Sequence, residues 1–356
     1  MDKKENWNLE LFQYIKQGEP SQVEKTKVWE TAIGLQEVDG LKPSKYLVET
    51  AKEHIEGNIN LEEVKKRIDN YYKVLDSRKL EEKENIEEAD KVSVRIAEIL
   101  SDKSFNFSPT ELISIHKKLF TGIYKLAGVI RNYNFTKDEW ILNGDTVTYA
   151  SYENVMAALE YDFEQERNFS YKNLSLDESI KHLCRFTSNI WQVHPFCEGN
   201  TRTTAVFIIK YLRTFGFNIN DDVFANSSWY FRNSLVRANY KNFEKNIFED
   251  ISYLEKFFYN LLSDTKYELK NRYTHIDYTE DKICEKLKCK NCTLEEQVIL
   301  NLIKENSTIK QDEIAIILGK SLRTIKTRMN EMQGKGLITR KNGKRNGEWE
   351  ILLELK

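Results

Sequence analysis

The chain has 356 residues and a formal net charge of −2, with 40% hydrophobic and 31% charged residues. This composition excludes a disordered or fibrous protein, and the length predicts two or three folded domains. No apolar run reaches the roughly 18 residues of a membrane span, and the N-terminus lacks the apolar segment of a secretory signal. We therefore expect a cytoplasmic protein without a membrane partner.

Residues 1–75 predict a small helical domain. Its helical stretches are expected at 9–18, 23–40, 44–57 and 61–75. Gly18, Gly40 and Gly57 lie where these helices should end, because glycine readily adopts the left-handed conformation that closes many helices. The run 75–91 is dense in charge, so it is either a linker or the exposed start of a further helix.

Residues 76–275 predict a larger helical domain. Ser175 and Glu178 have the spacing of a capping box, which marks the start of a helix. Residues 139–150 predict a β-hairpin with Asn143-Gly144 as its turn. An isolated hairpin is marginally stable in water, so this one must pack on the helices or bind a partner. The apolar run 205–209 is typical of a helix at the centre of a bundle.

Residues 276–292 predict a linker. Three of the five cysteines, Cys284, Cys289 and Cys292, lie there with His275 just upstream. Thiolates and imidazole suit zinc, but the second CxxC or histidine pair of a usual zinc site is missing. The odd number of cysteines also argues against a disulfide framework.

Residues 293–356 have the pattern of a winged helix-turn-helix domain, in which three helices precede a hairpin. The spacing of apolar residues turns one face of the third helix toward the core. These residues are Leu322, Ile325, Met329 and Met332.

Local charge in this last domain favours a polyanionic partner. Eleven basic residues against four acidic ones give residues 304–345 a net charge of +7. This charge suits duplex DNA, with the third helix in the major groove and the wing on the backbone. The expected DNA contacts are Arg323, Thr324, Lys326, Thr327, Lys344 and Arg345. Winged helices also dock proteins, and that alternative stays open.

The stretch from Val193 to Thr204, VHPFCEGNTRTT, concentrates reactive and anion-binding groups between two apolar helices. The first helix is expected to end at His194, because Pro195 disfavours helical geometry in the residue before it. A loop then leads to a helix that starts near Thr201. The amides at that helix start can bind a phosphate, and Gly199 lets the backbone approach a ligand closely.

The side chains of this loop favour transfer of a group from a nucleotide to a hydroxyl. Asn200 and Arg202 can donate hydrogen bonds to phosphate oxygens. Glu198 suits Mg²⁺ beside those phosphates, and His194 can take a proton from an incoming hydroxyl. Singly, each residue also has a structural explanation, such as a buried histidine or a surface arginine. The ordered set favours a site.

Residues 194–202, HPFCEGNTR, resemble the motif HPFx(D/E)GN(G/K)R of the Fic (Fic/Doc) family, with Thr201 in place of glycine or lysine. Residues 115–131 are similar to the upstream signature of the family, and residues 139–150 fall where its flap hairpin belongs. The resemblance covers roughly residues 85–275. The fold that it implies is mainly α: a Fic helical bundle with a β-hairpin flap, beside a small N-terminal helical domain and a C-terminal winged helix.

The resemblance implies a protein adenylyltransferase that moves AMP from ATP to a Ser, Thr or Tyr hydroxyl of a target protein. His194 would be the base and Glu198 would hold Mg²⁺. Phe196 would anchor the loop in the core. The residues at the nucleotide would be Phe196, Gly199, Asn200, Thr201 and Arg202. The flap would align the target backbone beside its strand through Ile141, Leu142, Asn143, Gly144, Asp145, Thr146 and Val147.

Ala205 departs from the family pattern, which often continues to a second arginine that binds the terminal phosphate. The sequence therefore leaves room for a donor other than ATP. Residues 30–59 are similar to the small antitoxin-like domains that inhibit Fic proteins through a glutamate paired with that arginine. Here Asp39-Gly40 replaces Glu-Gly and Leu35 replaces the usual Ser or Thr. We expect inhibition by Asp39 and Gly40 to be steric or weak, without the usual ion pair; a simple helical cap is the alternative.

Two hypotheses about function follow. The first is a Mg²⁺-dependent enzyme held in check by its own N-terminal domain. The second is a DNA-binding regulator, or a toxin–antitoxin-like protein, whose Fic domain uses another nucleotide or is inactive. His194 and Glu198 favour the first, and Ala205 favours the second. The expected partners are a nucleotide, a protein hydroxyl and duplex DNA, and a homodimer is compatible with the sequence.

Overall fold

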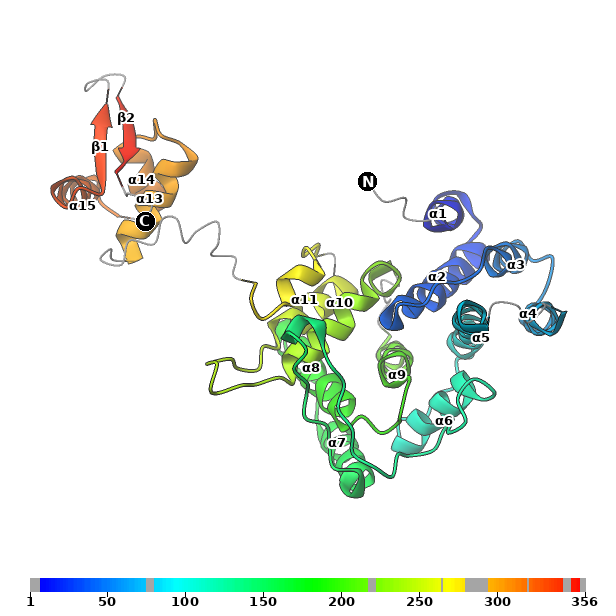
Figure 1. Cartoon of the computed structure of the whole chain (residues 1–356). Coiled ribbons are helices and arrows are strands. Elements are labelled where there is room, and N and C mark those ends of the chain that lie inside the picture. Colours follow the sequence, from blue (N-terminus) through cyan, green and yellow to red (C-terminus); the bar gives the residue numbers. More distant parts are fainter. Residues whose placement is uncertain are drawn as a thin grey trace. The chain divides into compact units, whose positions relative to one another are not determined.

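The structure is a computed structural model that describes residues 7–74, 80–216, 222–263, 265–278, 294–318, 320–341 and 347–352. The chain divides into two compact units, Met1–Tyr278 and Thr279–Lys356 (Figure 1). The described residues are mostly helical and contain one antiparallel pair of strands. The prediction of a mainly α fold is therefore confirmed. Over these ranges, no helix combines the length and the apolar character that crossing a membrane requires.

The first unit is a helical bundle with short 3₁₀ helices in its connections. Its elements are α1 (Trp7–Gln17), α2 (Pro20–Gly34), η1 (Leu35–Asp39), α3 (Lys45–Ile55), α4 (Leu61–Val74), α5 (Leu80–Ser101), α6 (Pro109–Phe120), η2 (Trp140–Leu142), η3 (Tyr152–Asn154), α7 (Val155–Asn168), α8 (Leu176–Val193), α9 (Asn200–Thr214), α10 (Asp222–Ala238), α11 (Ser252–Leu262) and η4 (Asn271–Thr274).

The expected helix ends are confirmed in part. Gly40 and Gly57 have the left-handed φ that glycine favours at such positions, 71° and 84°. Gly18 is not among the residues with positive φ, and its N–H donates to Tyr14 O over 2.8 Å. Gly18 nevertheless lies at a helix end as expected, because α1 ends at Gln17. The helix predicted to reach residue 40 ends at Gly34 and continues as the tighter η1.

Helix α9 is the central helix of the first unit, as its apolar sequence predicts. Every residue from Asn200 to Leu212 is buried, and the helix packs against α5, α6 and α8 (Figure 1). The ring of Phe207 lies 5.3 Å from that of Phe163 and 5.2 Å from that of Phe105. Burying one such side chain stabilises the fold by about 1.5–3 kcal/mol. This packing holds the N-terminal end of α9 firmly in place.

The N-terminal helices pack on the same bundle through a close helix contact. Helix α2 lies against α5 and α10. At its last residue, Gly34, an added Cβ would lie 2.4 Å from the Cα of Ala225, so a side chain there would separate the helices. Ser228 Oγ also donates to Gly34 O over 2.7 Å. This contact places η1, the next element, against α9 and α10.

The flap segment, residues 139–150, has the predicted turn without paired strands. Asn143 and Gly144 have φ of 58° and 83°, as a two-residue hairpin turn requires. The arm before the turn is η2 instead of a strand. Ile141 in this arm is fully buried, and its carbonyl accepts from Ile276 N–H over 2.9 Å. The backbone of this arm is therefore bonded to another segment and does not form the hydrogen-bond ladder of a hairpin.

The second unit has the predicted order of helices and hairpin. Its elements are α13 (Leu294–Glu305), α14 (Gln311–Ile317), α15 (Leu322–Gly334), β1 (Ile338–Lys341) and β2 (Glu348–Ile351). The strands pair antiparallel. Ile325, Met329 and Met332 face the core as expected, but Leu322 is 40% exposed. Leu322 comes directly after the N-cap Ser321, where α15 begins outside the core.

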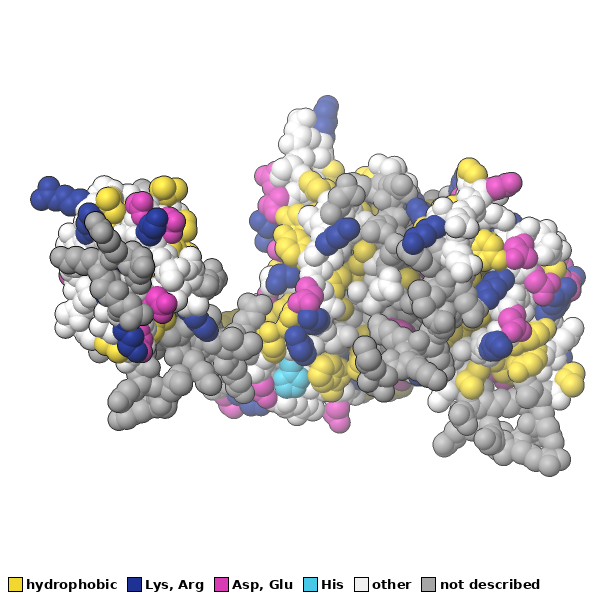
Figure 2. Space-filling view, turned by 90° about the horizontal axis from the view of Figure 1, so that it is seen from above, with side chains coloured by type: hydrophobic (Ala, Val, Ile, Leu, Met, Phe, Trp, Pro, Cys, Tyr) yellow, Lys and Arg dark blue, Asp and Glu magenta, His cyan; other side chains and the backbone are white. Residues whose placement is uncertain are grey.

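The surface mixes both signs of charge. In the view of Figure 2, Lys and Arg side chains are interspersed with Asp and Glu over the described faces of both units. Neither sign dominates the faces seen there. Surface charge alone therefore does not mark the functional site of the first unit.

Candidate active site

The loop from His194 to Gly199 joins α8 to α9, and both of its ends are left-handed. His194 has φ of 50° and Gly199 has φ of 73°. Positive φ is unfavourable for a histidine, so other contacts must hold it. Arg131 does so: its Nε donates to His194 O over 2.7 Å, and its backbone N–H donates to Pro195 O over 2.9 Å. His194 is thus fixed at the point where the chain turns away from α8.

Gly199 brings the start of α9 beside this histidine. An added Cβ would lie 2.4 Å from the ring of Phe120, so both the left-handed φ and the ring require glycine. The first N–H groups of a helix lack intrahelical acceptors and form its positive end. Gly199, Asn200 and Thr201 line one small cavity with His194. The predicted phosphate seat therefore lies next to the imidazole.

The hydrogen bonds of His194 leave one ring nitrogen free to act as a base. Nδ1 lies 3.3 Å from Trp191 O, and a carbonyl can only accept, so Nδ1 carries the hydrogen. Nε2 then has a lone pair, and it is buried without a partner among the described residues. Burial lowers the pKa of His194 well below its ordinary value, and the charge of Lys137 lowers it further. At neutral pH the ring is therefore neutral and can accept a proton.

Aromatic neighbours set the orientation of this ring. Tyr149 stacks on His194 with centroids 3.9 Å apart, and Trp191 meets it edge-on at 5.3 Å. The indole N–H of Trp191 donates to Thr201 Oγ1 over 2.9 Å. Thr201, the residue that departs from the motif, therefore positions Trp191 and through it the imidazole of His194.

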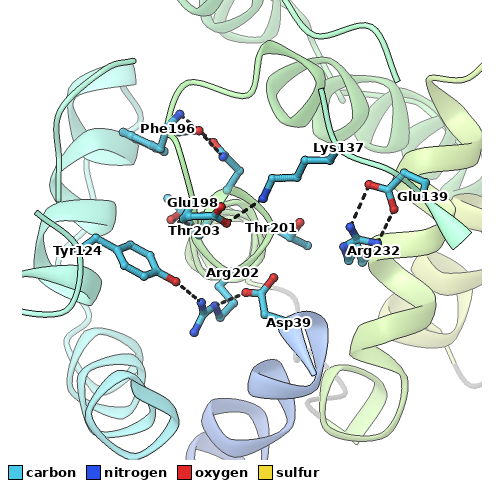
Figure 3. Close-up of polar contacts among 12 residues, drawn as sticks. Asp39, Tyr124, Lys137, Glu139, Phe196, Glu198, Thr201, Arg202, Thr203 and Arg232 are labelled. Carbon is cyan, nitrogen blue, oxygen red and sulfur yellow. Dashed lines mark hydrogen bonds and ion pairs between the residues drawn. The ribbon is translucent and has the colours of Figure 1, made fainter. Parts of the chain in front are cut away.

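Asn200 closes the loop with both groups of its side chain. Its Oδ1 accepts from Phe196 N–H over 3.0 Å, and its Nδ2 donates to Phe196 O over 2.7 Å (Figure 3). The side chain thus holds the shape of the loop beside the start of α9. Phe196 is buried in the core, as the resemblance implies.

His116 supports the same loop from α6. Its ring stacks on Phe196 with centroids 3.7 Å apart. Gly128 N–H donates to its Nδ1 over 2.8 Å, so its Nε2 carries the hydrogen and donates to Glu198 O over 3.0 Å. Burial lowers the pKa of His116 to about 4. A neutral His116 therefore fixes the backbone of Glu198.

Glu198 projects a half-exposed carboxylate toward solvent. Its Oε2 lies 2.7 Å from Nζ of Lys137, which belongs to the segment before η2 (Figure 3). An ammonium group thus occupies a position that suits a cation. No three His, Cys, Asp or Glu side chains in the described ranges meet as a metal cage. The donor set fits Mg²⁺, which is usually held by one or two carboxylates together with waters and substrate phosphates.

Arg202 is fully buried and is surrounded by acceptors from η1, from α5 and from the segment after α6. Nη1 donates to Gln36 Oε1 over 3.0 Å, and Nη2 donates to Glu88 Oε1 over 2.6 Å. Nη2 also donates to the hydroxyl of Tyr124 over 2.8 Å. Asp39 Oδ2 lies 2.7 Å from Nε, without the alignment of a hydrogen bond (Figure 3).

These acidic partners keep the guanidinium charged. Burial by itself lowers the pKa of Arg202, but the nearby Asp39 and Glu88 carboxylates raise it above its ordinary value. Ala205 leaves no second arginine for the usual ion pair, and Asp39 instead forms an ion pair with Arg202 of the motif, a contact that the sequence did not predict. Gly40, the C-cap of η1, makes the turn that ends this element.

The space around His194 is closed in this arrangement. The cavity that His194 lines measures about 20 Å³, which is room for one water. Asp39 and Lys137 are among its walls, and Asp39 also borders a neighbouring cleft of about 550 Å³. The space beside His194 is thus too small for a phosphate in this arrangement, and Asp39 and Lys137 are side chains whose movement would enlarge it.

The flap residues divide into a buried and an exposed set. Ile141, Leu142 and Val147 are fully buried, so their side chains are not on the surface that a target could reach. Their side chains are part of the hydrophobic core. The exposed residues are Asn143 and Gly144, while Asp145 and Thr146 are half-buried. The turn is therefore the part of this set whose side chains are accessible.

The predicted DNA contacts of the second unit lie on one helix where they are described. Arg323, Thr324, Lys326 and Thr327 are all exposed on α15. Lys344 and Arg345, on the wing, lie outside the described residues, as do Cys284, Cys289 and Cys292 of the segment with zinc-like spacing. Helix α15 can therefore present these side chains to a partner.

Comparison with known proteins identifies both units. Residues 106–212 match the model of the Fic/DOC family. The chain carries a Fic/DOC domain. Residues 296–339 match a winged helix-turn-helix DNA-binding family. The loop and the first three turns of α9 lie inside the Fic match, so the geometry above describes a Fic site.

Two known proteins are similar to this chain. The protein adenylyltransferase VbhT of Bartonella schoenbuchensis is 28% identical over 161 residues, which cover 42% of this chain and 32% of VbhT. This chain thus spans about a third of the length of that relative. A solved Fic family protein from Desulfovibrio desulfuricans G20 aligns over 99% of this chain and 96% of its own, with a TM-score of 0.40 and 12% identity.

Sequence reasoning missed the residues that surround the motif. His116 and Arg131 lie within residues 115–131, the upstream signature, and that resemblance was the available signal. Glu88 and Lys137 have no such signal, because each lies in an ordinary charged segment. Only the folded chain brings them to Arg202 and Glu198.

Proposed function

We propose that the Fic domain is a protein adenylyltransferase, which moves AMP from ATP to a Ser, Thr or Tyr hydroxyl of a target protein. One observation supports this proposal above all. The buried Nε2 of His194 carries a lone pair and no partner, and it lines a cavity with the first residues of α9. A base beside a phosphate seat is what transfer to a hydroxyl requires.

In this reaction the target hydroxyl oxygen attacks the α-phosphorus of ATP. A bond forms between that oxygen and phosphorus, and the bond from phosphorus to the oxygen bridging to the β-phosphate breaks. Pyrophosphate leaves with the electron pair. The hydroxyl proton passes to Nε2 of His194, and Trp191 O stabilises the resulting imidazolium through Nδ1–H.

Glu198 is the residue that would hold Mg²⁺. The ion, when bound, neutralises charge on the phosphates and on the leaving pyrophosphate. The exposure of Glu198 leaves room for waters and phosphate oxygens in the coordination shell, while His116 fixes its backbone. The similarity to an adenylyltransferase supports the nucleotide and metal together.

The present arrangement is an inhibited state in this proposal. Arg202, the phosphate-binding residue of the motif, is held by Asp39 from η1. A carboxylate at that position competes with phosphate for the same guanidinium. Glu88 of α5 also holds Arg202, so removing the N-terminal helices alone leaves one carboxylate in place. Full activity therefore requires both groups to release the arginine.

The test is to incubate the protein with Mg²⁺ and ATP labelled either at the α- or at the γ-phosphate, and separately with the other nucleoside triphosphates. AMP transfer gives α-label on protein without γ-label, and mass spectrometry then locates the adduct. His194→Ala should abolish labelling, while Glu198→Ala should abolish it without unfolding the protein. If no nucleotide labels any protein, even with Asp39→Asn, the proposal fails.

The winged helix supports a second function, binding to duplex DNA. The exposed basic and hydroxyl side chains on α15 are the observation that favours it. The two functions are compatible in one chain, because different units carry them. Binding of a labelled duplex at several salt concentrations tests this function directly.

A further inference from the structure

The motif itself supplies little free positive charge to the proposed phosphate site of this Fic domain. Ala205 stands where the family pattern often has its second arginine, and it is fully buried on α9. Arg202 is shared between two carboxylates. A triphosphate brings several negative charges to this place, so a further cation is needed to hold its distal end.

The small cavity beside His194 is lined by two cationic side chains. These are Lys137 and Arg232. Arg232 is already paired with a buried carboxylate. Its Nη1 and Nη2 lie 2.6 and 2.9 Å from the two oxygens of Glu139, a carboxylate with 1% of its side chain exposed (Figure 3). Breaking this bidentate pair would leave a buried carboxylate unpaired, at a large cost.

Lys137 is bound in a much weaker way. Lys137 forms an ion pair with Glu198 at 2.7 Å, and the two side chains are 29% and 55% exposed. Exposed pairs of this kind contribute little to stability, so Lys137 can change partners at low cost. The ammonium group of a lysine also sits on a flexible four-carbon stem, so it can turn to a new partner more readily than an arginine in a bidentate pair. Lys137 and His194 line the same small cavity, so the ammonium group lies close to the imidazole.

We propose that Lys137 binds the distal phosphates of the nucleotide in place of the missing second arginine. Without ligand, its ammonium neutralises Glu198. When a divalent cation binds Glu198, the lysine loses its partner and turns to the phosphates that arrive with that cation. Glu198 and Lys137 thereby couple metal loading to nucleotide loading. This inference rests on the proposed function, because it assumes that a nucleotide binds beside His194.

The experiment measures binding instead of turnover, in the full chain and in the full chain with Asp39→Asn. A fluorescent ATP analogue is titrated with Mg²⁺, and Mn²⁺ alone is titrated by electron paramagnetic resonance. The variants are Lys137→Gln, which removes the charge, and Lys137→Arg, which keeps it. Lys181→Gln is the matched control, because Lys181 forms an exposed ion pair of similar length, 2.8 Å, with Asp177.

We expect opposite effects of Lys137→Gln on the two ligands. The nucleotide Kd should rise about tenfold or more, because one charge-assisted contact is lost. Mn²⁺ should bind a few-fold more tightly, because its competitor for Glu198 is gone. Lys137→Arg should keep nucleotide affinity within about threefold of the parent, and Lys181→Gln should change neither Kd.

The possible failures are distinguishable. A nucleotide Kd that is unchanged by Lys137→Gln overturns this inference and leaves the proposed function standing. Equal losses in Lys137→Gln and Lys137→Arg also overturn it, since they would indicate a role in the shape of the segment. If neither the parent nor the Asp39→Asn protein binds nucleotide with Mg²⁺, the proposed function and this inference fall together.

Discussion

The contact between Asp39 and Arg202 gives the sharpest prediction about regulation. Asp39→Asn removes one negative charge and keeps the size of the side chain. Arg202 stays buried and keeps its contacts with Gln36, Glu88 and Tyr124. The substitution therefore weakens the hold of η1 on the arginine without leaving the guanidinium unpaired.

The size of the effect follows from the geometry of this contact. An interaction of a polar group with a charged partner contributes about 1.5–3 kcal/mol. Asp39 is 34% exposed and its contact with Nε is not aligned as a hydrogen bond, so the lower end applies. About 1.5 kcal/mol corresponds to about tenfold in an equilibrium constant. If nucleotide must displace Asp39, its Kd should fall about tenfold.

Two measurements on the same variant check this reasoning. The free energy of unfolding without ligand should fall by about 1.5 kcal/mol in urea titrations, because an ion pair is lost. Affinity for a fluorescent ATP analogue with Mg²⁺ should rise, and so should the rate of labelling by α-labelled ATP. The opposite signs distinguish an inhibitory contact from a merely structural one.

Asp138→Asn is the control, because Asp138 borders the same cleft and the change in charge is the same. It tests whether a general decrease in negative charge explains any gain. The reasoning is refuted if Asp39→Asn lowers stability while nucleotide affinity stays the same. It is refuted as well if Asp138→Asn increases affinity by an equal factor.

Three further predictions concern individual side chains. Thr201→Val should lower the free energy of unfolding by about 1–3 kcal/mol, because the buried indole N–H of Trp191 loses its acceptor. Thr201→Ser keeps a hydroxyl and should be close to wild type in urea titrations. Equal losses in the two variants would contradict this prediction. His116 has its pKa lowered to about 4 by burial, so its stabilising contribution is present above pH 6.5 and is lost as the pH falls toward 4. Between pH 7 and pH 5 the wild type should therefore lose about 2 kcal/mol more stability than His116→Phe, and parallel pH profiles would contradict it. Arg323→Ala should weaken binding to duplex DNA and lower the slope of log affinity against log salt by about one, whereas Lys45→Ala in the first unit should have no effect.

Much of the candidate site could be predicted because it depends on neighbours in sequence. Pro195 ends α8, Gly199 allows a left-handed turn, and the apolar residues after Thr201 bury α9 whatever surrounds it. These are local properties of the backbone and of hydrophobic periodicity. The side chains of the motif thus come together in any fold that keeps the loop.

The expected flap hairpin did not form, because a distant segment binds the backbone groups that its strands would use. The flap turn at Asn143-Gly144 formed, but the core took the residues beside it, and a hairpin ladder did not form. The local signal for the turn was correct, and burial decided which partner the backbone of Ile141 bonds.

The sequence by itself determined the helical character of the chain, the order of its units, and a loop in which a histidine and a carboxylate precede a buried helix. Only the tertiary structure decided how those groups are controlled. Asp39 and Glu88 reach Arg202, and Lys137 reaches Glu198, from far along the chain. The physical reason is that such pairs depend on how closely helices approach, as where Gly34 lets α2 lie against α10, and no local pattern of residues encodes that distance.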